Sequence, residues 1–264
     1  MIRVGVIGAC GKMGVMVCST VAADAELGLV AAIDRTHVGE QIGPLCGHPE
    51  VKVPVSDELD TLLQAEVEVV VDFTHPDVVM DDIGWAIGHA VNIVVGTTGI
   101  SESNLDEIRG LLEDEGNESN VFIAPNFAIG AVLAERFAAQ AARYLPAVEI
   151  IELHHDQKAD APSGTALHAA RAIRDARAAD YHGPEAETLA GVRGGELDGI
   201  RIHSVRLPGL VAHEEIIFGG PGQTLTIRHD SMDRASFMPG VVMAVKSVSS
   251  APGLTVGLDS LLDG

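Results

Sequence analysis

The sequence predicts an α/β protein whose first domain is a doubly wound parallel sheet and whose second is an α+β domain with a mixed sheet. Three observations support this fold class. Short apolar runs alternate with helical segments in the first half, a glycine-rich turn follows the first run, and consecutive strand-like runs fill much of the second half. A chain of 264 residues is long enough for two domains. We expect one at 1–128, completed by 235–264, and the other at 129–234.

The first half alternates between strand-like and helix-like patterns. The expected strands cover residues 2–7, 27–33, 67–71, 92–95 and 121–124, and the expected helices cover residues 15–23, 76–89 and 102–115. An irregular stretch with several Gly and Pro residues, 39–54, interrupts the alternation. Because a helix usually returns the chain between parallel neighbours, this order predicts a parallel sheet.

The turn after the first strand, Gly8-Ala9-Cys10-Gly11-Lys12-Met13-Gly14, has the glycine spacing of a dinucleotide-binding turn. In such a turn Gly8 permits the tight bend, Gly11 lets a pyrophosphate approach the backbone, and Gly14 lets the helix pack closely on the strand. The strand before it and the helix after it complete a Rossmann-type context, whereas an ordinary tight turn is the alternative. The residues expected to contact the cofactor here are Gly8, Ala9, Gly11, Lys12, Met13 and Gly14.

The second strand ends in Asp34, which follows Gly14 by 20 residues, where a carboxylate hydrogen-bonds the adenosine ribose of NAD. Its neighbours affect the cofactor preference, because Lys12 in the turn and Arg35 can both reach the 2′-phosphate of NADP. We therefore expect both NADH and NADPH to be used. A surface acid without a ligand is the alternative interpretation of Asp34.

Two further strand ends have polar residues suited to a ligand. They are Asp-Phe-Thr-His-Pro at 72–76 and Gly-Thr-Thr-Gly at 96–99. In open α/β sheets ligands bind beyond the carboxyl ends of the strands, so both segments are expected to converge on the cofactor. As turns and helix caps they would need no ligand.

The pattern changes after residue 128. The expected helices cover residues 129–143 and 164–179, the expected strands cover residues 148–153, 200–206, 211–218 and 223–229, and a polar loop covers 181–198. This order predicts a mixed sheet with helices on one face. A final helix, 233–249, can return the chain to the first domain.

The run from His154 to Ala166 combines a proton donor, a cation and a helix N-terminus. It lies between the strand at 148–153 and the next helix, whose first N–H groups have no intrahelical partner and attract anions. We therefore expect His154 and Lys158 to be catalytic, the latter also as an anchoring cation for a substrate carboxylate. The expected substrate-binding residues are His155, Ser163, Gly164 and Thr165. A helix capped by Ser163 beside a solvated charged loop is the alternative.

Composition excludes several classes of function. The formal net charge of −21, from 38 acidic and 17 basic side chains, repels nucleic acid, and no local basic patch appears. No apolar run is long enough to span a membrane, and the first strand begins too early to leave room for a signal peptide. The 3 cysteines have no metal-like spacing, so we expect no metal and a reduced, cytoplasmic compartment.

Taken together, the motifs resemble those of the 4-hydroxy-tetrahydrodipicolinate reductase family, long called dihydrodipicolinate reductases, of bacterial lysine and diaminopimelate biosynthesis. The resemblance covers nearly the whole chain, and the histidine–lysine run is its most specific part. The segments that carry it are the glycine turn, Phe73-Thr74 with Pro76, Gly96-Thr97-Thr98-Gly99, Pro125-Asn126-Phe127, residues 152–166, and Arg234 with Phe237.

The resemblance implies NAD(P)H-dependent reduction of 4-hydroxy-tetrahydrodipicolinate to tetrahydrodipicolinate. It also implies a homotetramer built through the sheet of the second domain, with an active site in the interdomain cleft. Hydride reduction of a conjugated cyclic imine leaves an enamine-like anion, which His154 would protonate. Further residues implied at the cofactor are Phe73, Thr74, Gly96, Thr98, Pro125, Asn126, Phe127, Arg234 and Phe237.

Two other functions share part of this pattern. A different nicotinamide-dependent dehydrogenase, acting for instance on an amino-dicarboxylate, would share the first domain but would not need the histidine–lysine run. A nonenzymatic NAD(P)H sensor would need the cofactor turn alone, and no DNA-binding helix is visible. The run from His154 to Ala166 therefore favours the reductase.

Overall fold

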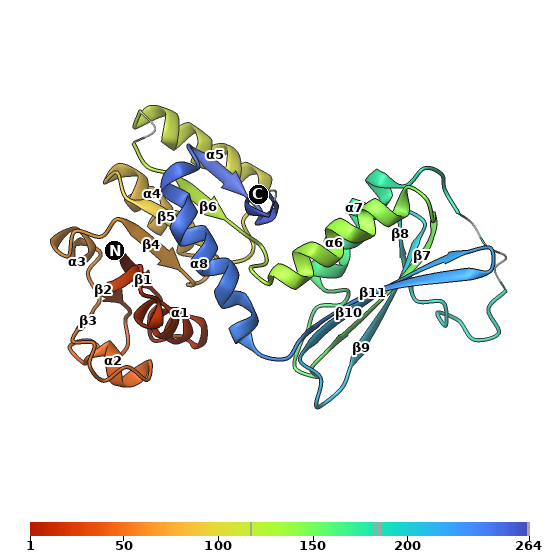
Figure 1. Ribbon diagram of the computed structural model, residues 1–264, viewed down its shortest axis with the longest axis horizontal. Coiled ribbons are helices and arrows are strands. Elements are labelled where there is room, and N and C mark those ends of the chain that lie inside the picture. The colour runs from red at the N-terminus through yellow and green to blue at the C-terminus, as the bar shows by residue number, and fades with distance from the viewer. Residues whose placement is uncertain (117, 182, 184–185, 263–264) are drawn as a thin grey trace. The chain divides into compact units, whose positions relative to one another are not determined.

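The computed structural model describes residues 1–116, 118–181, 183 and 186–262. The chain forms two compact units. Unit 1 comprises Met1–Phe127 together with the segment that begins at Phe237, and unit 2 comprises Ala128–Ser236. Figure 1 shows the helices and strands of each. The substrate-binding and oligomerisation role expected for unit 2 stays a prediction.

Unit 1 contains a parallel sheet, which has seven strands within the described residues, in the order β12-β6-β5-β4-β1-β2-β3. From β3 to β6 this is the strand order of dinucleotide-binding folds. The central strands are buried on both faces, as a sheet covered by helices on each side requires. The strands are β1 (Ile2–Ile7), β2 (Leu27–Ile33), β3 (Val55–Ser56), β4 (Val69–Asp72), β5 (Asn92–Val95), β6 (Val121–Ile123) and β12 (Leu254–Val256).

The helices of unit 1 form two groups, in which α1 packs beside α8 and α4 packs beside α5. One core cluster includes Ile33, Val70, Ile83, Ile93 and Ile108, and thus joins the sheet to α4 and α5. The helices are α1 (Lys12–Ala23), α2 (Ile42–Leu45), α3 (Asp60–Gln64), α4 (Val79–Gly88), α5 (Glu102–Asp114) and α8 (Met238–Ser247), with short 3₁₀ helices at Val248–Ser250 and Asp259–Leu261.

Unit 2 contains a mixed sheet, which has five strands within the described residues, in the order β11-β10-β7-β9-β8. Only the β7–β9 pairing among them is parallel. Ala138 of α6 and Ile173 of α7 belong to a core cluster that also contains Ile150 and Ile216 of the sheet, so the two helices cover one face. The elements are α6 (Ile129–Ala142), β7 (Ala147–His154), α7 (Gly164–Ala176), β8 (Gly195–Leu197), β9 (Ile200–Arg206), β10 (Ala212–Gly220) and β11 (Gln223–Ser231).

The predicted fold class is confirmed, with corrections at element ends. The helix expected to reach residue 179 ends at Ala176, because Arg177 has extended backbone angles. The single helix expected at 233–249 is divided into a 3₁₀ helix, Arg234–Phe237, and α8, which has a proline in its first turn. Part of the loop expected at 181–198 lies outside the described residues, as do the last two positions of the expected segment 235–264.

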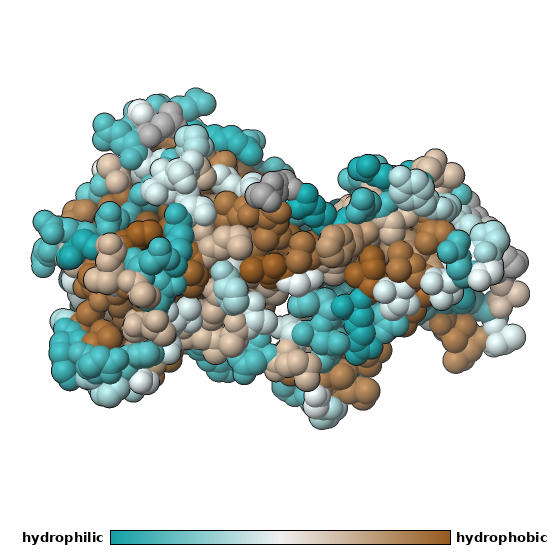
Figure 2. All heavy atoms as spheres, viewed as in Figure 1, coloured by the Kyte–Doolittle hydropathy of each residue, from teal (hydrophilic) through white to brown (hydrophobic). Residues whose placement is uncertain are grey.

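Surface polarity is uneven within each unit. In the view of Figure 2, hydrophobic residues are exposed along α8 in unit 1 and along α6 in unit 2, and hydrophilic residues cover much of the remainder. Among the described residues, no helix has the length and hydropathy needed to cross a bilayer.

Candidate active site

The glycine turn of unit 1 is closely packed. Gly8 has a φ of 74°, and a Cβ there would lie 2.8 Å from the carbonyl oxygen of Phe73. A Cβ at Gly14 would lie 1.9 Å from the carbonyl oxygen of Gly8, so α1 can approach the turn only because that side chain is absent. Helix α1 begins after Gly11 with no capping side chain and no acidic residue in its first turn. Its N-terminus therefore suits a pyrophosphate.

Asp34 connects this turn to the loop after β2. One carboxylate oxygen accepts a hydrogen bond from the Cys10 N–H at 2.9 Å, and the other accepts from the N–H and the hydroxyl of Thr36 at 2.9 and 2.7 Å. Burial opposes ionisation, but the hydrogen bonds from Thr36 and Cys10 outweigh it and hold the pKa of Asp34 below its ordinary value. Lys12 and Arg35 are exposed nearby in the sequence. An ionised Asp34 retains lone pairs for a ribose hydroxyl.

A buried carboxylate joins the ends of β4 and β5. Asp72 accepts hydrogen bonds from the Thr74 N–H at 3.0 Å and from the Thr97 hydroxyl at 2.8 Å. The structure thus brings together the two polar strand ends, as the sequence predicts. Asp72 and Thr97 belong to the two segments expected at the cofactor, although neither was assigned a contact of its own. The sequence signal for the hydrogen bonds at the end of β4 is an Asp at the last buried strand position followed by a Thr two residues on, which is a common turn arrangement.

Aromatic rings lie beside these strand ends. A Cβ at Gly96 would lie 2.1 Å from the ring of Phe73, so this ring covers the glycine. Phe73 and Phe127 have ring centroids 5.9 Å apart. Phe127 is 2% exposed and also packs on Phe122, whereas Thr98 is exposed. Of these residues, Thr98 is therefore the more accessible to a ligand.

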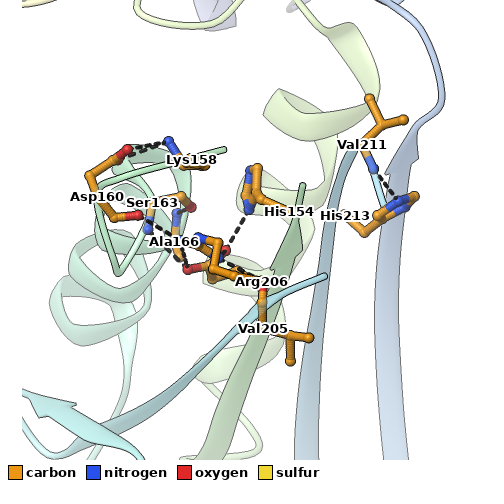
Figure 3. Close-up of polar contacts among 10 residues, drawn as sticks. His154, Lys158, Asp160, Ser163, Ala166, Val205, Arg206, Val211 and His213 are labelled. Atoms are coloured by element: carbon orange, nitrogen blue, oxygen red, sulfur yellow. Dashed lines mark hydrogen bonds and ion pairs between the residues drawn. The ribbon is translucent and has the colours of Figure 1, made fainter. Parts of the chain in front are cut away.

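In unit 2 the histidine–lysine run follows β7 and leads into α7 (Figure 3). Ser163 caps α7, because its hydroxyl accepts a hydrogen bond from the Ala166 N–H at 3.1 Å. Its own N–H donates to Glu152 at 3.3 Å. Ser163 thus performs the capping role that was the alternative interpretation. The N–H groups of Gly164 and Thr165 begin the helix, and its first turn contains no acidic residue.

Glu152 is the centre of the polar network in unit 2. It is fully buried, and its oxygens accept hydrogen bonds from Arg206 at 2.7 Å twice and from His154 Nδ1 at 2.5 Å. Burial disfavours its ionisation, but the contacts with Arg206 and His154 hold the pKa of Glu152 below its ordinary value. Neither Glu152 nor Arg206 was assigned a role from the sequence, although Glu152 begins the segment 152–166. Glu152 lies two positions after the core residue Ile150 and so points to the same buried face of β7, where a charge needs a partner.

His154 and Lys158 have different electrostatic surroundings. Burial lowers the pKa of His154, although Glu152 partly opposes this shift, and Nδ1 is engaged with that carboxylate. The other ring nitrogen, Nε2, is the one left for substrate. Lys158 is 23% exposed and donates to both oxygens of Asp160 at 2.8 Å. Its predicted role as an anchor thus requires exchange of Asp160 for a substrate carboxylate.

Three further residues predicted at the site are His155, Arg234 and Phe237. His155 is exposed, and its N–H donates to the Val211 carbonyl at 3.4 Å. Arg234 is exposed and belongs to unit 2, whereas Phe237 is half-buried and belongs to unit 1. Among the described residues, no cluster of His, Cys, Asp and Glu could hold a metal ion.

Comparison with known proteins identifies the family. Models of the dihydrodipicolinate reductase N-terminus and C-terminus match residues 2–127 and 130–262, respectively. The chain belongs to the dihydrodipicolinate reductase family. Its relatives include the 4-hydroxy-tetrahydrodipicolinate reductases of Nocardia farcinica, 51% identical, and Mycolicibacterium gilvum, 49% identical, each over 99% of both chains.

Solved structures agree with this dihydrodipicolinate reductase assignment. A dipicolinate-bound dihydrodipicolinate reductase from Paenisporosarcina sp. TG-14 has 44% identity and a TM-score of 0.86, covering 98% of this chain and 99% of that one. An amine dehydrogenase from Mycobacterium smegmatis, 15% identical with a TM-score of 0.67 over 98% of this chain and 95% of its own, shares the fold alone. The chain is thus an oxidoreductase of lysine and diaminopimelate biosynthesis, with an NAD(P)-binding unit 1, as the sequence predicts.

Proposed function

We propose that this chain reduces 4-hydroxy-tetrahydrodipicolinate to tetrahydrodipicolinate with NADH or NADPH, through the residues that the sequence singles out in its two units. The observation that carries the proposal is the network in which buried Glu152 holds both His154 and Arg206. It fixes a histidine at the start of a loop that also contains Lys158 and ends at an anion-accepting helix N-terminus. A proton donor and a carboxylate anchor are what reduction of a cyclic dicarboxylate imine needs.

In unit 1 the residues fit a nicotinamide dinucleotide, which supplies the hydride when bound. The first N–H groups of α1 would receive the pyrophosphate, because neither a capping side chain nor an acidic residue occupies that helix N-terminus. Asp34 accepts a hydrogen bond from the adenosine ribose, and Lys12 and Arg35 balance a 2′-phosphate when the ligand has one. The remaining residues proposed at the cofactor are Ala9, Gly11, Met13, Phe73, Thr74, Gly96, Thr98, Pro125, Asn126, Phe127, Arg234 and Phe237.

In unit 2 the substrate carboxylate is held by the Gly164 and Thr165 N–H groups and by Lys158. His155 and Ser163 border this position in the sequence. His154 donates the proton from Nε2, while Glu152 accepts from Nδ1 and stabilises the imidazolium from which the proton leaves. The dipicolinate bound to the Paenisporosarcina reductase supports a ring dicarboxylate as the ligand of this site.

The reaction itself can be tested by coupling. The product of the preceding synthase in the pathway, generated enzymatically, should cause this chain to oxidise NADH or NADPH. Neither nucleotide should be consumed when the synthase is omitted. A working synthase with no nucleotide oxidation by the folded chain would contradict the proposal, and circular dichroism of the same sample would establish that the fold is intact.

We also propose a homotetramer that forms through the sheet of unit 2, in the cytoplasm. α6 and α7 cover one face of that sheet, and the opposite face carries the half-buried apolar side chains of Ile151, Leu153, Val205 and Ile217. Apolar side chains on a sheet face that these helices do not cover favour association. Sedimentation analysis should give four times 27.6 kDa, or about 110 kDa, and a mass of one chain would contradict the tetramer.

A further inference from the structure

A second glutamate lies beside the network of Glu152. β10 pairs with β7 so that Glu214 is directly opposite Glu152, and on its other side Glu214 is opposite His229 of β11. Directly opposed residues of an antiparallel pair point to the same face of the sheet. Glu214 is 9% exposed and Glu152 is fully buried. Two carboxyl groups are therefore neighbours in a region from which water is largely excluded.

Their hydrogen-bond partners are unequal. Glu152 accepts hydrogen bonds from Arg206, His154 and the Ser163 N–H. Within the described part of the chain, Glu214 Oε2 is buried with no hydrogen-bond partner. The two terminal nitrogens of the Arg206 guanidinium bind Glu152, and its Nε, like Glu214 Oε2, is buried without a hydrogen-bond partner among the described residues.

The other groups that face Glu214 do not favour a negative charge. α6 contributes the carboxylate of Glu135, which forms an ion pair with His168 of α7 at 3.8 Å. Burial lowers the pKa of His229 on β11, so its imidazole is mainly neutral at pH 7. Burial, followed by the charges of Glu135 and Glu152, raises the pKa of Glu214 to about 7. Neighbouring buried carboxyl groups ionise one after the other rather than together.

We propose that Glu214 is a positioning residue of the reductase. When Glu214 is protonated, it leaves Glu152 ionised to hold His154. When Glu214 is ionised, it adds negative charge that keeps His154 protonated as the pH rises. The inference rests on the proposed function, since His154 must be the proton donor. As a positioning residue Glu214 acts through Glu152, which lies directly opposite it on β7. Loss of the proton from Glu214 adds a negative charge that stabilises the imidazolium of His154, so activity extends to higher pH.

Glu214→Gln separates charge from shape, because the amide is nearly isosteric and cannot ionise. The alkaline limb of kcat, measured between about pH 5 and about pH 9, should move to lower pH by roughly 1 unit. Glu214→Asp, which can still ionise, should restore most of the limb. An unchanged alkaline limb in Glu214→Gln would overturn the positioning role.

Glu215→Gln is the matched control on the same strand. The side chain of Glu215 is partly exposed and forms an ion pair with Arg228 at 2.8 Å, away from Glu152. The same chemical change at this position should leave the alkaline limb where it is. An equal shift in both variants would show that the effect is not specific to Glu214 and would overturn the proposal.

Protonation of Glu214 can also be measured without activity. The infrared difference spectrum of the wild type minus Glu214→Gln should contain the carbonyl band of a neutral carboxylic acid at about pH 6 and lose it as the pH rises through about 7. The subtraction removes the band of Asp82, whose pKa is also raised to about 7. Because the folded-state pKa is above that of the unfolded chain, wild-type stability relative to Glu214→Gln should fall as the pH rises from about 4.5 through about 7.

Absence of that carbonyl band would contradict the proposal for Glu214 while leaving the proposed function untouched. Conversely, the expected carbonyl band together with full activity of the His154→Gln variant would contradict the proposed function, and with it the role of Glu214. The two failures are therefore distinguishable.

Discussion

At the scale of single residues, Glu152 explains why a histidine at the end of a strand can be a defined proton donor. Its carboxylate is buried, is bound bidentately by Arg206, and orients the His154 ring through Nδ1. The types and spacing of His154 and Lys158 were readable from the sequence, because few structural requirements combine those residues with a helix N-terminus. The pairing of Glu152 with Arg206 could not be predicted from the sequence, since Arg206 is 54 positions away and contacts Glu152 only when β7 and β9 pair.

His154→Gln is expected to lower kcat by roughly 10²- to 10⁴-fold, because glutamine keeps a polar side chain but cannot donate the proton as an acid. KM should change much less. Burial lowers the pKa of His154 below its usual 6.5, so the wild-type kcat should begin to fall at a pH below 6.5 and should continue to fall as the pH rises. Steady-state kinetics over that range measures both effects, and a variant with the kcat of the wild type would exclude His154 as the donor.

Lys158→Ala is expected to raise KM by about 10- to 100-fold and to lower kcat as well, because a charge-assisted contact with the substrate carboxylate is lost. Asp160→Asn provides the opposite case. It removes the carboxylate that occupies Lys158 in this structure, so KM should not rise and is expected to fall. Equal KM values in all three proteins would show that Lys158 does not bind substrate.

Cofactor preference is a further property of single side chains. Both nucleotides should be used within about tenfold of one another, because Asp34 favours free ribose hydroxyls while Lys12 and Arg35 attract a 2′-phosphate. Asp34→Ala should shift preference toward NADPH, and Lys12→Ala should shift it toward NADH. Since Asp34 also binds the Cys10 N–H, Asp34→Asn controls for disturbance of the turn. Unchanged ratios of kcat/KM for the two nucleotides would contradict both assignments.

At the scale of elements, several strands could be predicted from the sequence, whereas the shortest elements could not. The strands at 27–33 and 92–95 were predicted with their observed bounds, because largely apolar runs identify buried strands. The strand at 200–206 was also predicted with its observed bounds, because Ile200 and Ile202 alternate with polar residues. The short elements α2, α3, β3, β8 and β12 were missed. With between two and five residues each, they are too short to show a period, and long-range pairing decides their conformation.

Gly14→Ala tests the turn–helix junction. A Cβ at this position would overlap the Gly8 carbonyl, so the variant should lose roughly 2 kcal/mol or more of unfolding free energy and bind nucleotide weakly. Gly110→Ala in α5 is the matched control, because a Cβ there meets nothing within 4 Å; it should stabilise by about 0.5–1 kcal/mol. Chemical denaturation and nucleotide titration of both variants measure the difference. Equal stabilities would show that the junction tolerates a side chain.

At the scale of the whole molecule, the division into two units follows from a change in pattern along the chain. Alternating strands and helices give way near residue 128 to a helix and then to consecutive strands, and the observed boundary falls between Phe127 and Ala128. The return of the chain to unit 1 was predicted as one helix. The contribution of β12 to the edge of that unit's sheet was not predicted. Its three residues pair with β6, and the paired residues Leu254 and Val121 are 133 positions apart in the chain.

The return of α8 and β12 to unit 1 also sets an order during synthesis. Unit 2 is one uninterrupted segment, so all its strands and helices are translated before α8. Unit 1 begins first but lacks α8, whose Gly240 packs against the Phe127 carbonyl, and the edge strand β12 until the last residues appear. Since domains generally fold as units, the nucleotide-binding unit finishes folding after the unit inserted into it, although its own first strand is made before everything else.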